Sequence, residues 1–139
     1  MKPYDLPGYE ELNHTADISI KVWATSMEEL FNYALKGMYA LLDIKGNHKD
    51  KGVKRKIILT GVDYEDLLIS FLSEFNYLAQ MEYLFSEIIE LSIDQRILQT
   101  KVLEKRILEI PKEIKAVTYH NLRIQHTKNG YSVIIVFDV

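Results

Sequence analysis

Hydrophobic and polar residues alternate with two different periods along the first third of this chain. From Asp17 to Ala24, apolar residues occupy every second position, which is the pattern of a strand with two unlike faces. Ser26 and Glu29 then form a capping box, and the apolar residues behind it recur at helical spacing. The sequence therefore predicts a strand followed by a helix that ends near Asp43, before Gly46.

A second strand and a second helix are predicted next. Branched and basic residues from Val53 to Thr60 indicate the strand, and Gly61 marks its end. Asp63 is the predicted N-cap of a helix that begins near Tyr64. The apolar stripe of this helix is explained better by core packing than by a cofactor pocket. It comprises Leu67, Leu68, Phe71, Leu72, Phe75 and Leu78.

β-Branched and aromatic residues dominate the final third of the chain, where turn signals separate four predicted strands. The strands are Phe85 to Ile93, Arg96 to Leu103, Ala116 to Thr127 and Tyr131 to Phe137. No repeat and no linker rich in glycine and serine interrupts the sequence. We therefore expect a single α+β domain over residues 1–139, with mixed, largely antiparallel β-sheets packed with two main helices.

The last two strands permit a register prediction, because Asn129 and Gly130 are a strong signal for a two-residue type I′ turn. Lys128 then faces Tyr131, and the apolar side chains of both strands gather on one face. Asp138 points to the opposite face. The remaining predicted pairs are His126 with Val133, Ile124 with Ile135, Leu122 with Phe137, and His120 with Val139.

The composition excludes several kinds of site. The chain has no cysteine, which rules out disulfides, thiolate zinc sites and thiol nucleophiles and suits a reducing cytoplasm. No stretch approaches the ~20 apolar residues of a membrane span, and we expect a cytoplasmic protein that is neither exported nor embedded in a membrane. Twenty acidic against seventeen basic residues give a net charge of −3, which argues against strong direct nucleic-acid binding.

One basic cluster stands out against this balance: Lys49, Lys51, Lys54, Arg55 and Lys56. Its place at a predicted turn and strand favours a solvated face over an RNA-binding patch. The sequence also contains no P-loop, dinucleotide fingerprint, zinc-binding helix motif or nucleophile elbow. An independent nucleotide-binding enzyme is therefore disfavoured.

The end of the last predicted strand is a candidate half-site for a cation. Asp138 follows an apolar run, and the carboxylate of Val139 adds further oxygen atoms. Ca²⁺, Mg²⁺ and Mn²⁺ prefer carboxylate and carbonyl oxygen ligands. The alternative is an aspartate that is simply solvated.

A second candidate half-site precedes the first predicted strand. His14 and Asp17 offer one nitrogen and one carboxylate there, although local backbone hydrogen bonds in a turn are the alternative explanation. Asp43 either ends the first helix or approaches the strand that Asp17 begins.

Lys115 and His120 complete the candidate residues. His120 has the reach for proton transfer or for pairing with the terminal carboxylate, and a structural, hydrogen-bonded histidine is the alternative. Lys115 lies six residues beyond Asn121, the predicted partner of Asp138. That separation is about 20 Å on a straight strand, so Lys115 approaches Asp138 only if the strand bends.

Four blocks of this sequence resemble the archease family. They are YEELNHTADI at 9–18, SMEELF at 26–31, IKAVTYH at 114–120 and the ending FDV at 137–139. The blocks stand in the family's order and span nearly the whole chain, and the predicted helix at 63–78 resembles the family's central helix. The combination is specific, whereas each block alone is not.

The resemblance implies an accessory protein of an RNA-splicing ligase rather than an enzyme. That ligase joins a 2′,3′-cyclic phosphate or 3′-phosphate end to a 5′-hydroxyl, notably in tRNA splicing. The family protein promotes GTP-dependent guanylylation of a ligase histidine and multiple turnover. The implied partner is therefore the ligase, and GTP and RNA are engaged through it.

The resemblance also assigns roles to residues. Family metal-site aspartates map onto Asp17 and Asp138, with Asp43 a third match, and the implied cofactor is a divalent cation such as Ca²⁺, Mg²⁺ or Mn²⁺. A family lysine needed for activation maps onto Lys115, and His14 matches the motif without a defined ligand role. Two other functions stay open: an independent metal-dependent hydrolase and a chaperone-like interaction module.

Overall fold

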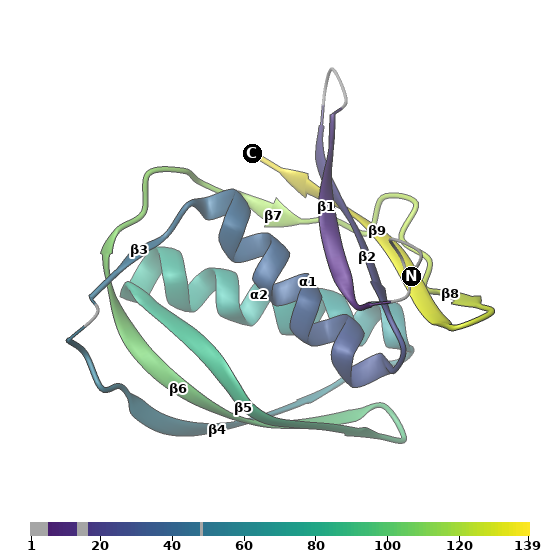
Figure 1. Ribbon diagram of the computed structural model, residues 1–139, viewed down its shortest axis with the longest axis horizontal. Coiled ribbons are helices and arrows are strands. Elements are labelled where there is room, and N and C mark those ends of the chain that lie inside the picture. Colours follow the sequence, from purple (N-terminus) through teal and green to yellow (C-terminus); the bar gives the residue numbers. More distant parts are fainter. Residues whose placement is uncertain (1–5, 14–16, 48) are drawn as a thin grey trace.

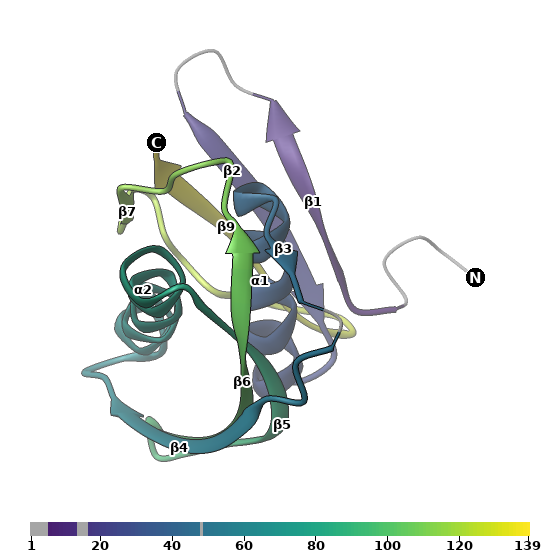
Figure 2. The same ribbon diagram turned by 90° about the vertical axis from the view of Figure 1, so that its left-hand side faces the viewer.

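Two helices lie between two β-sheets in this computed structural model (Figures 1 and 2). The structure describes residues 6–13, 17–47 and 49–139. Every strand pair within these ranges is antiparallel, so the predicted α+β class with two main helices is confirmed. No helix in the described part of the chain is long and apolar enough to cross a membrane.

The first sheet joins the beginning of the chain to its end. Its order is β1 (Gly8–Asn13), β2 (Ile18–Ala24), β9 (Gly130–Asp138) and β7 (Ala116–Val117), and β8 (Gln125–Thr127) also pairs with β9. β1 is an edge strand that was not predicted. Its apolar residues Tyr9 and Leu12 are three positions apart, so its sequence lacks the alternation that indicates a strand.

The second sheet is built on the long strand β6 (Ile97–Glu109). β6 pairs with β4 (Val53–Thr60), β5 (Leu84–Asp94) and the short strand β3 (Lys45–Gly46). β5 and β6 are joined by Gln95 and Arg96, whose φ angles of 50° and 61° are those of a type I′ turn. The bounds predicted for β4 are confirmed, whereas β3 was not predicted.

The two helices begin where their capping residues predict. α1 (Met27–Leu42) starts after Ser26, whose hydroxyl accepts the Glu29 backbone N–H at 3.1 Å. α2 (Tyr64–Glu82) starts after Asp63, whose carboxylate accepts the Asp66 N–H at 2.7 Å. The predicted stripe of α2 is fully within the core, where the rings of Phe31, Phe71 and Phe75 pack at centroid distances of 5.3 and 4.9 Å.

The predicted register of the last hairpin is wrong by two residues. Thr127 pairs with Gly130 and His126 with Tyr131, so the two turn residues are 128–129. The shift has a limited effect on the side chains, because a slip of two residues preserves the face on which each side chain lies.

A glycine is required at position 130 because the backbone of β2 lies very close to it, and not because of the turn. Its φ is 150°, and a Cβ atom at this position would lie 2.1 Å from the carbonyl oxygen of Ala24, the last residue of β2. Val133, Ile135 and Phe137 are buried as the predicted parity requires. Asp138 is exposed, as expected for the opposite face.

The predicted strand from Ala116 to Thr127 is instead two short strands separated by an excursion. β7 pairs with the end of β9 and β8 with its beginning, while residues 118–124 lie outside both strands. The predicted pairs of His120 with Val139 and of Leu122 with Phe137 therefore do not form. Leu122 still packs against the core.

Two acidic side chains in the first turn of α2 hold this 118–124 excursion. Glu65 accepts the backbone N–H of Ile124 at 2.9 Å, and Asp66 accepts the hydroxyl of Tyr119 at 2.7 Å. The Tyr119 hydroxyl and then the backbone N–H of Val62 lower the pKa of Asp66, because both donate to its charged form.

We expect the variant Tyr119→Phe to raise the pKa of Asp66 toward the ordinary value of about 3.9. The folded-state pKa is depressed, so this interaction stabilises the fold above the unfolded-state pKa and is lost as the pH falls through the folded-state pKa. Carboxyl NMR titration measures the shift, with Tyr77→Phe on exposed α2 surface as the control. An Asp66 pKa that is the same in Tyr119→Phe and in the unmodified protein would contradict this prediction.

Candidate functional site

Asp17 and Asp138 lie at the same end of two neighbouring strands. β2 and β9 pair with Ile18 opposite Phe137, and the two aspartates are the next residues outward along the same register. In a continued antiparallel register, opposing residues have Cα atoms about 5 Å apart and side chains on one face. The expectation that the first predicted strand lies beside the last one is thus confirmed.

The two aspartates belong to the face that points away from the helices. Phe137 is 1% exposed and lies on the core face, and side chains alternate between faces along a strand. Asp17 and Asp138 are both exposed. Figures 1 and 2 show the C-terminal end of β9 beside the beginning of β2.

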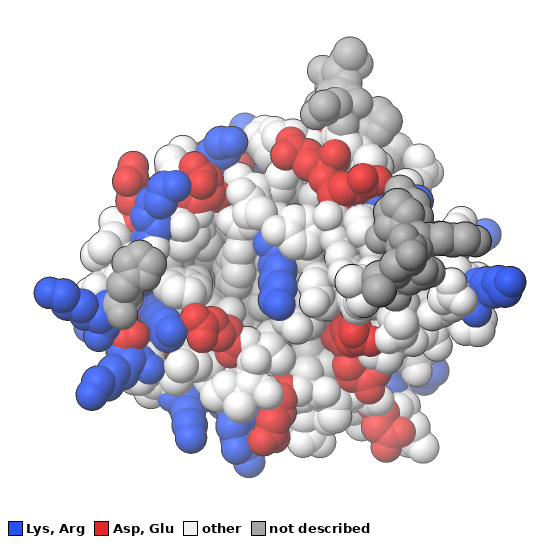
Figure 3. All heavy atoms as spheres, viewed as in Figure 1, with Lys and Arg blue, Asp and Glu red and all other residues white. Residues whose placement is uncertain are grey.

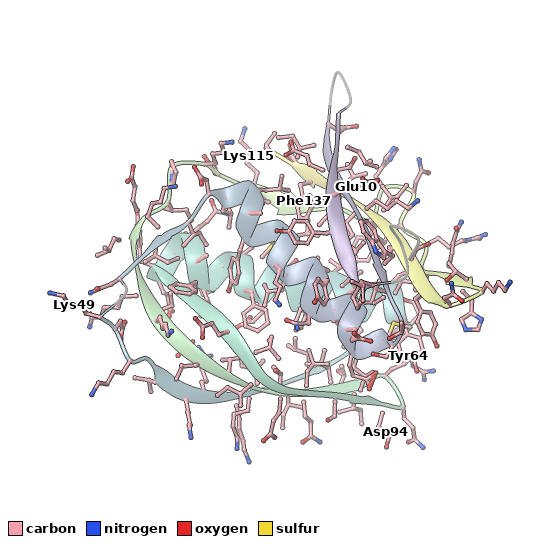
Figure 4. All side chains as sticks on the ribbon, in the orientation of Figure 1. Glu10, Lys49, Tyr64, Asp94, Lys115 and Phe137 are labelled. Carbon is pink, nitrogen blue, oxygen red and sulfur yellow. The ribbon has the colours of Figure 1, made fainter. Side chains whose placement is uncertain are left out.

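Lys115 lies beside Asp138, in contrast to the separation calculated for a straight strand. Its backbone N–H donates to the carbonyl oxygen of Asp138 at 2.7 Å, and Ala116 is the register partner of Asp138. The segment is not one straight strand: the chain leaves the sheet after Thr118, whose N–H still donates to the carbonyl oxygen of Val136, and the residues before Thr118 therefore lie at the end of β9. Figure 4 shows Lys115 and Phe137 at this end of the molecule.

Two side chains of α2 fix the peptide group that precedes Lys115. Asn76 and Gln80 both donate their amide N–H groups to the carbonyl oxygen of Ile114, at 3.1 and 2.5 Å. Asn76 is only 8% exposed, and a buried amide requires such a partner. Sequence reasoning missed both residues, although a polar residue among the apolar positions of a helix was the available signal.

Asp43 ends α1 and does not join the other two aspartates in a metal-binding cluster. Its φ is 53°, and its carboxylate accepts a hydrogen bond from the exposed Lys45 at 3.1 Å. Within residues 6–13, 17–47 and 49–139, no three histidine or acidic side chains are grouped closely enough to hold a metal ion. α1 nevertheless ends on the same side of the molecule as the C-terminus (Figures 1 and 2).

Of the remaining candidates, His120 lies apart from the carboxylate pair and Val139 directly follows Asp138. His120 is exposed in the turn that Leu122 closes by donating its N–H to the carbonyl of Tyr119, so it does not face Val139. Val139 itself is 47% exposed. His14 falls outside the described residues.

This geometry defines a small α+β protein. At one end of its first sheet, β2 and β9 bring together Asp17, Asp138 and the segment that contains Lys115. The family model described as "Archease protein family (MTH1598/TM1083)" matches residues 9–139. The chain belongs to the archease family.

Individual relatives are similar to it over nearly their whole length. A protein archease of Saccharolobus islandicus is 34% identical over 139 residues, covering 95% of this chain and 99% of the relative. A protein archease of Methanosarcina barkeri is 35% identical over 142 residues, covering 94% of this chain and 95% of the relative.

Two solved structures share the fold. The solution structure of Methanobacterium thermoautotrophicum protein 1598 matches with a TM-score of 0.72 and 23% identity, covering 95% of this chain and 99% of the other. A crystal structure of a Thermotoga maritima archease, described as a possible chaperone, matches with a TM-score of 0.69 and 21% identity, covering 94% and 96%.

Proposed function

We propose that this protein activates an RNA-joining ligase and is not an enzyme acting alone. In this proposal it promotes GTP-dependent guanylylation of a ligase histidine and multiple turnover of the ligase in tRNA splicing or RNA repair. Membership of the archease family supports the proposal. The observation that carries it is the β2–β9 register, which makes Asp17 and Asp138 neighbours although they come from opposite ends of the sequence.

We further propose that Asp17 and Asp138 hold a divalent cation, Ca²⁺, Mg²⁺ or Mn²⁺. The donor set fits a hard cation, because two exposed carboxylates share one face of the sheet end. Two carboxylates this close also repel each other, and a cation relieves that repulsion. Val139 is the proposed additional oxygen ligand, and Asp43, whose carboxylate bonds Lys45, stays a prediction as a further one. When bound, the cation would supply positive charge beside the two carboxylates.

Different residues of this chain have different roles in the proposed function. The aspartates bind and orient the cation, while the Asn76 and Gln80 side chains hold the backbone from which Lys115 projects. We propose that the exposed Lys115 contacts the ligase or the phosphate groups of its bound nucleotide, because its ammonium group is a positive charge that binds phosphate. His14 and His120 stay predictions as partner contacts.

The experiment that tests this proposal combines the protein with its cognate ligase, GTP and a divalent cation. We expect faster transfer of guanylate to the ligase and RNA joining beyond one turnover. An unchanged ligase contradicts the activator function. Turnover of phosphoesters by this protein alone, lost in Asp17→Asn, would favour the metal-dependent hydrolase instead.

We expect Lys115→Ala to separate activation from cation binding. The substitution removes a positive charge near the carboxylate pair, so affinity for Mn²⁺ stays equal or rises slightly, while stimulation of guanylylation falls at least about tenfold. Calorimetry and the guanylylation assay measure the two effects on the same preparation. Lys112→Ala, also exposed, is the control. Loss of Mn²⁺ binding in Lys115→Ala would contradict this separation, because it would show that Lys115 is needed for the cation site itself.

A further inference from the structure

The outer edge of β4 is an open strand edge on the sheet that does not carry the aspartate pair. Among the described residues, β4 pairs with β6 alone. In an antiparallel pair, alternate residues direct their N–H and C=O groups away from the partner strand, so one edge of β4 presents unpaired backbone groups. Val53 and Ile58 on this strand are 69% and 64% exposed. The edge is therefore a template for one more strand.

Basic side chains follow this edge on the outer face of the sheet. Lys54, Lys56 and Ile58 share that face, because side chains alternate along a strand. Lys56 also stands directly opposite Lys101 of β6, and like charges in opposing positions are unfavourable. Glu90 faces Lys101 from β5. Figure 3 shows Lys and Arg side chains gathered over the side of the molecule where β4 lies in Figure 1.

The ion pairs of the second sheet leave Lys54 and Lys56 uncompensated. Arg55 bonds Glu104 at 3.0 Å and Lys105 bonds Glu87 at 2.9 Å. In the described part of the chain, no ion pair includes Lys54 or Lys56. The face therefore offers two positive charges at alternate positions of an open edge, followed by an exposed apolar side chain.

The charge and backbone groups of this edge favour one of three possible ligands: a second copy of this chain, single-stranded nucleic acid or an extended peptide. A second copy of β4 would place lysines opposite lysines. This repulsion disfavours a homodimer formed through this edge. Single-stranded nucleic acid is bound by aromatic stacking platforms as well as by basic side chains, and none of the neighbours of Lys56 on this face is aromatic. They are Lys54, Ile58, Gln99, Lys101 and Leu103. Alternating backbone donors and acceptors are matched by another extended peptide.

We propose that β4 accepts an extended acidic peptide segment of another protein by strand addition. Carboxylates at alternate positions of the segment face Lys54 and Lys56, and an apolar side chain two positions further faces Ile58. This surface belongs to the second sheet, whereas Asp17 precedes β2 and Asp138 ends β9 in the first sheet. The inference therefore does not rest on the proposed ligase activation, and either one can fail without the other.

The first test is binding of a labelled, capped peptide, Thr-Glu-Thr-Glu-Thr-Val-Thr, followed by fluorescence anisotropy. We expect saturable binding that weakens at least about tenfold in the double variant Lys54→Glu/Lys56→Glu, because two attractive cross-strand pairs become repulsive. Lys112→Glu/Lys128→Glu changes the net charge equally at exposed positions elsewhere and serves as the control, with an expected change of less than about twofold.

The second test examines the backbone ladder without altering the protein. Two versions of the peptide carry N-methyl groups on alternate residues in opposite phases, so that only one version loses the N–H groups that face β4. We expect one version to bind and the other to fail. The proposal is overturned by equal binding of both versions, by unchanged binding to Lys54→Glu/Lys56→Glu, or by an oligouridylate of equal charge that binds more tightly and displaces the peptide.

Discussion

Asp17→Asn and Asp138→Asn are each expected to lose more than about tenfold of the stimulation of ligase guanylylation, because each substitution removes one of two carboxylates proposed to share a cation. The guanylylation assay with GTP and Mn²⁺ measures the loss. Asp94→Asn is the matched control, since it removes an exposed carboxylate at the far end of the molecule, well away from Lys115 (Figure 4).

The same variants should remain folded. Exposed carboxylates contribute little to stability, so the midpoints of urea unfolding for Asp17→Asn and Asp138→Asn are expected to match that of the unmodified protein. Full stimulation by either folded variant would remove that aspartate from the activating site. Loss of stimulation in Asp94→Asn as well would point to a general effect of charge.

Gly130→Ala is expected to lower the free energy of unfolding by about 3 kcal/mol. The residue has a φ of 150°, and the added Cβ atom would meet the carbonyl oxygen of Ala24, which is backbone and cannot rotate away. Relief of this clash requires β9 to move from β2, the pairing that brings the two aspartates together. We therefore also expect weaker stimulation of the ligase.

Urea unfolding followed by circular dichroism measures the change in stability at Gly130. Asn129→Ala, at the neighbouring turn residue, is the control and should change stability by less than about 0.5 kcal/mol. Equal unfolding midpoints for Gly130→Ala and Asn129→Ala would contradict the close approach of Gly130 to β2.

Elements with strong local signals could be predicted from the sequence. Ser26 and Asp63 mark both helix starts, because their side chains satisfy backbone N–H groups within the next turn and need no tertiary partner. The apolar stripe of α2 and the bounds of β4 were likewise evident, since periodicity reports which face is buried.

The hairpin register could not be predicted from turn signals, because the conformation of Gly130 is set by its close contact with β2 and not by the turn. Asn129 and Gly130 resemble a type I′ turn, yet Gly130 pairs with Thr127 and its missing Cβ is needed against β2. The type I′ geometry occurs instead at Gln95 and Arg96, residues that give no glycine or asparagine signal. Local turn chemistry therefore indicated the correct faces of β9 but the wrong partners.

The candidate site depended on the same nonlocal contacts. Periodicity alone does not show that β2 lies beside β9, and the expectation that Asp17 approaches Asp138 came from the family resemblance. Whether Lys115 approaches Asp138 depended on a bend that the sequence does not reveal, and Glu65 and Asp66 hold the 118–124 excursion at that bend. Such side-chain contacts between distant segments leave no periodic trace in a sequence.

The most direct measurement of the central claim is a double-mutant cycle for Mn²⁺ binding, followed by calorimetry with the unmodified protein, Asp17→Asn, Asp138→Asn and the double variant. If both carboxylates hold one cation, each single substitution weakens binding at least about tenfold, and the double variant loses much less than the sum of the two losses in binding free energy. Unmodified Mn²⁺ affinity in the double variant would contradict a shared cation site at the end of β2 and β9.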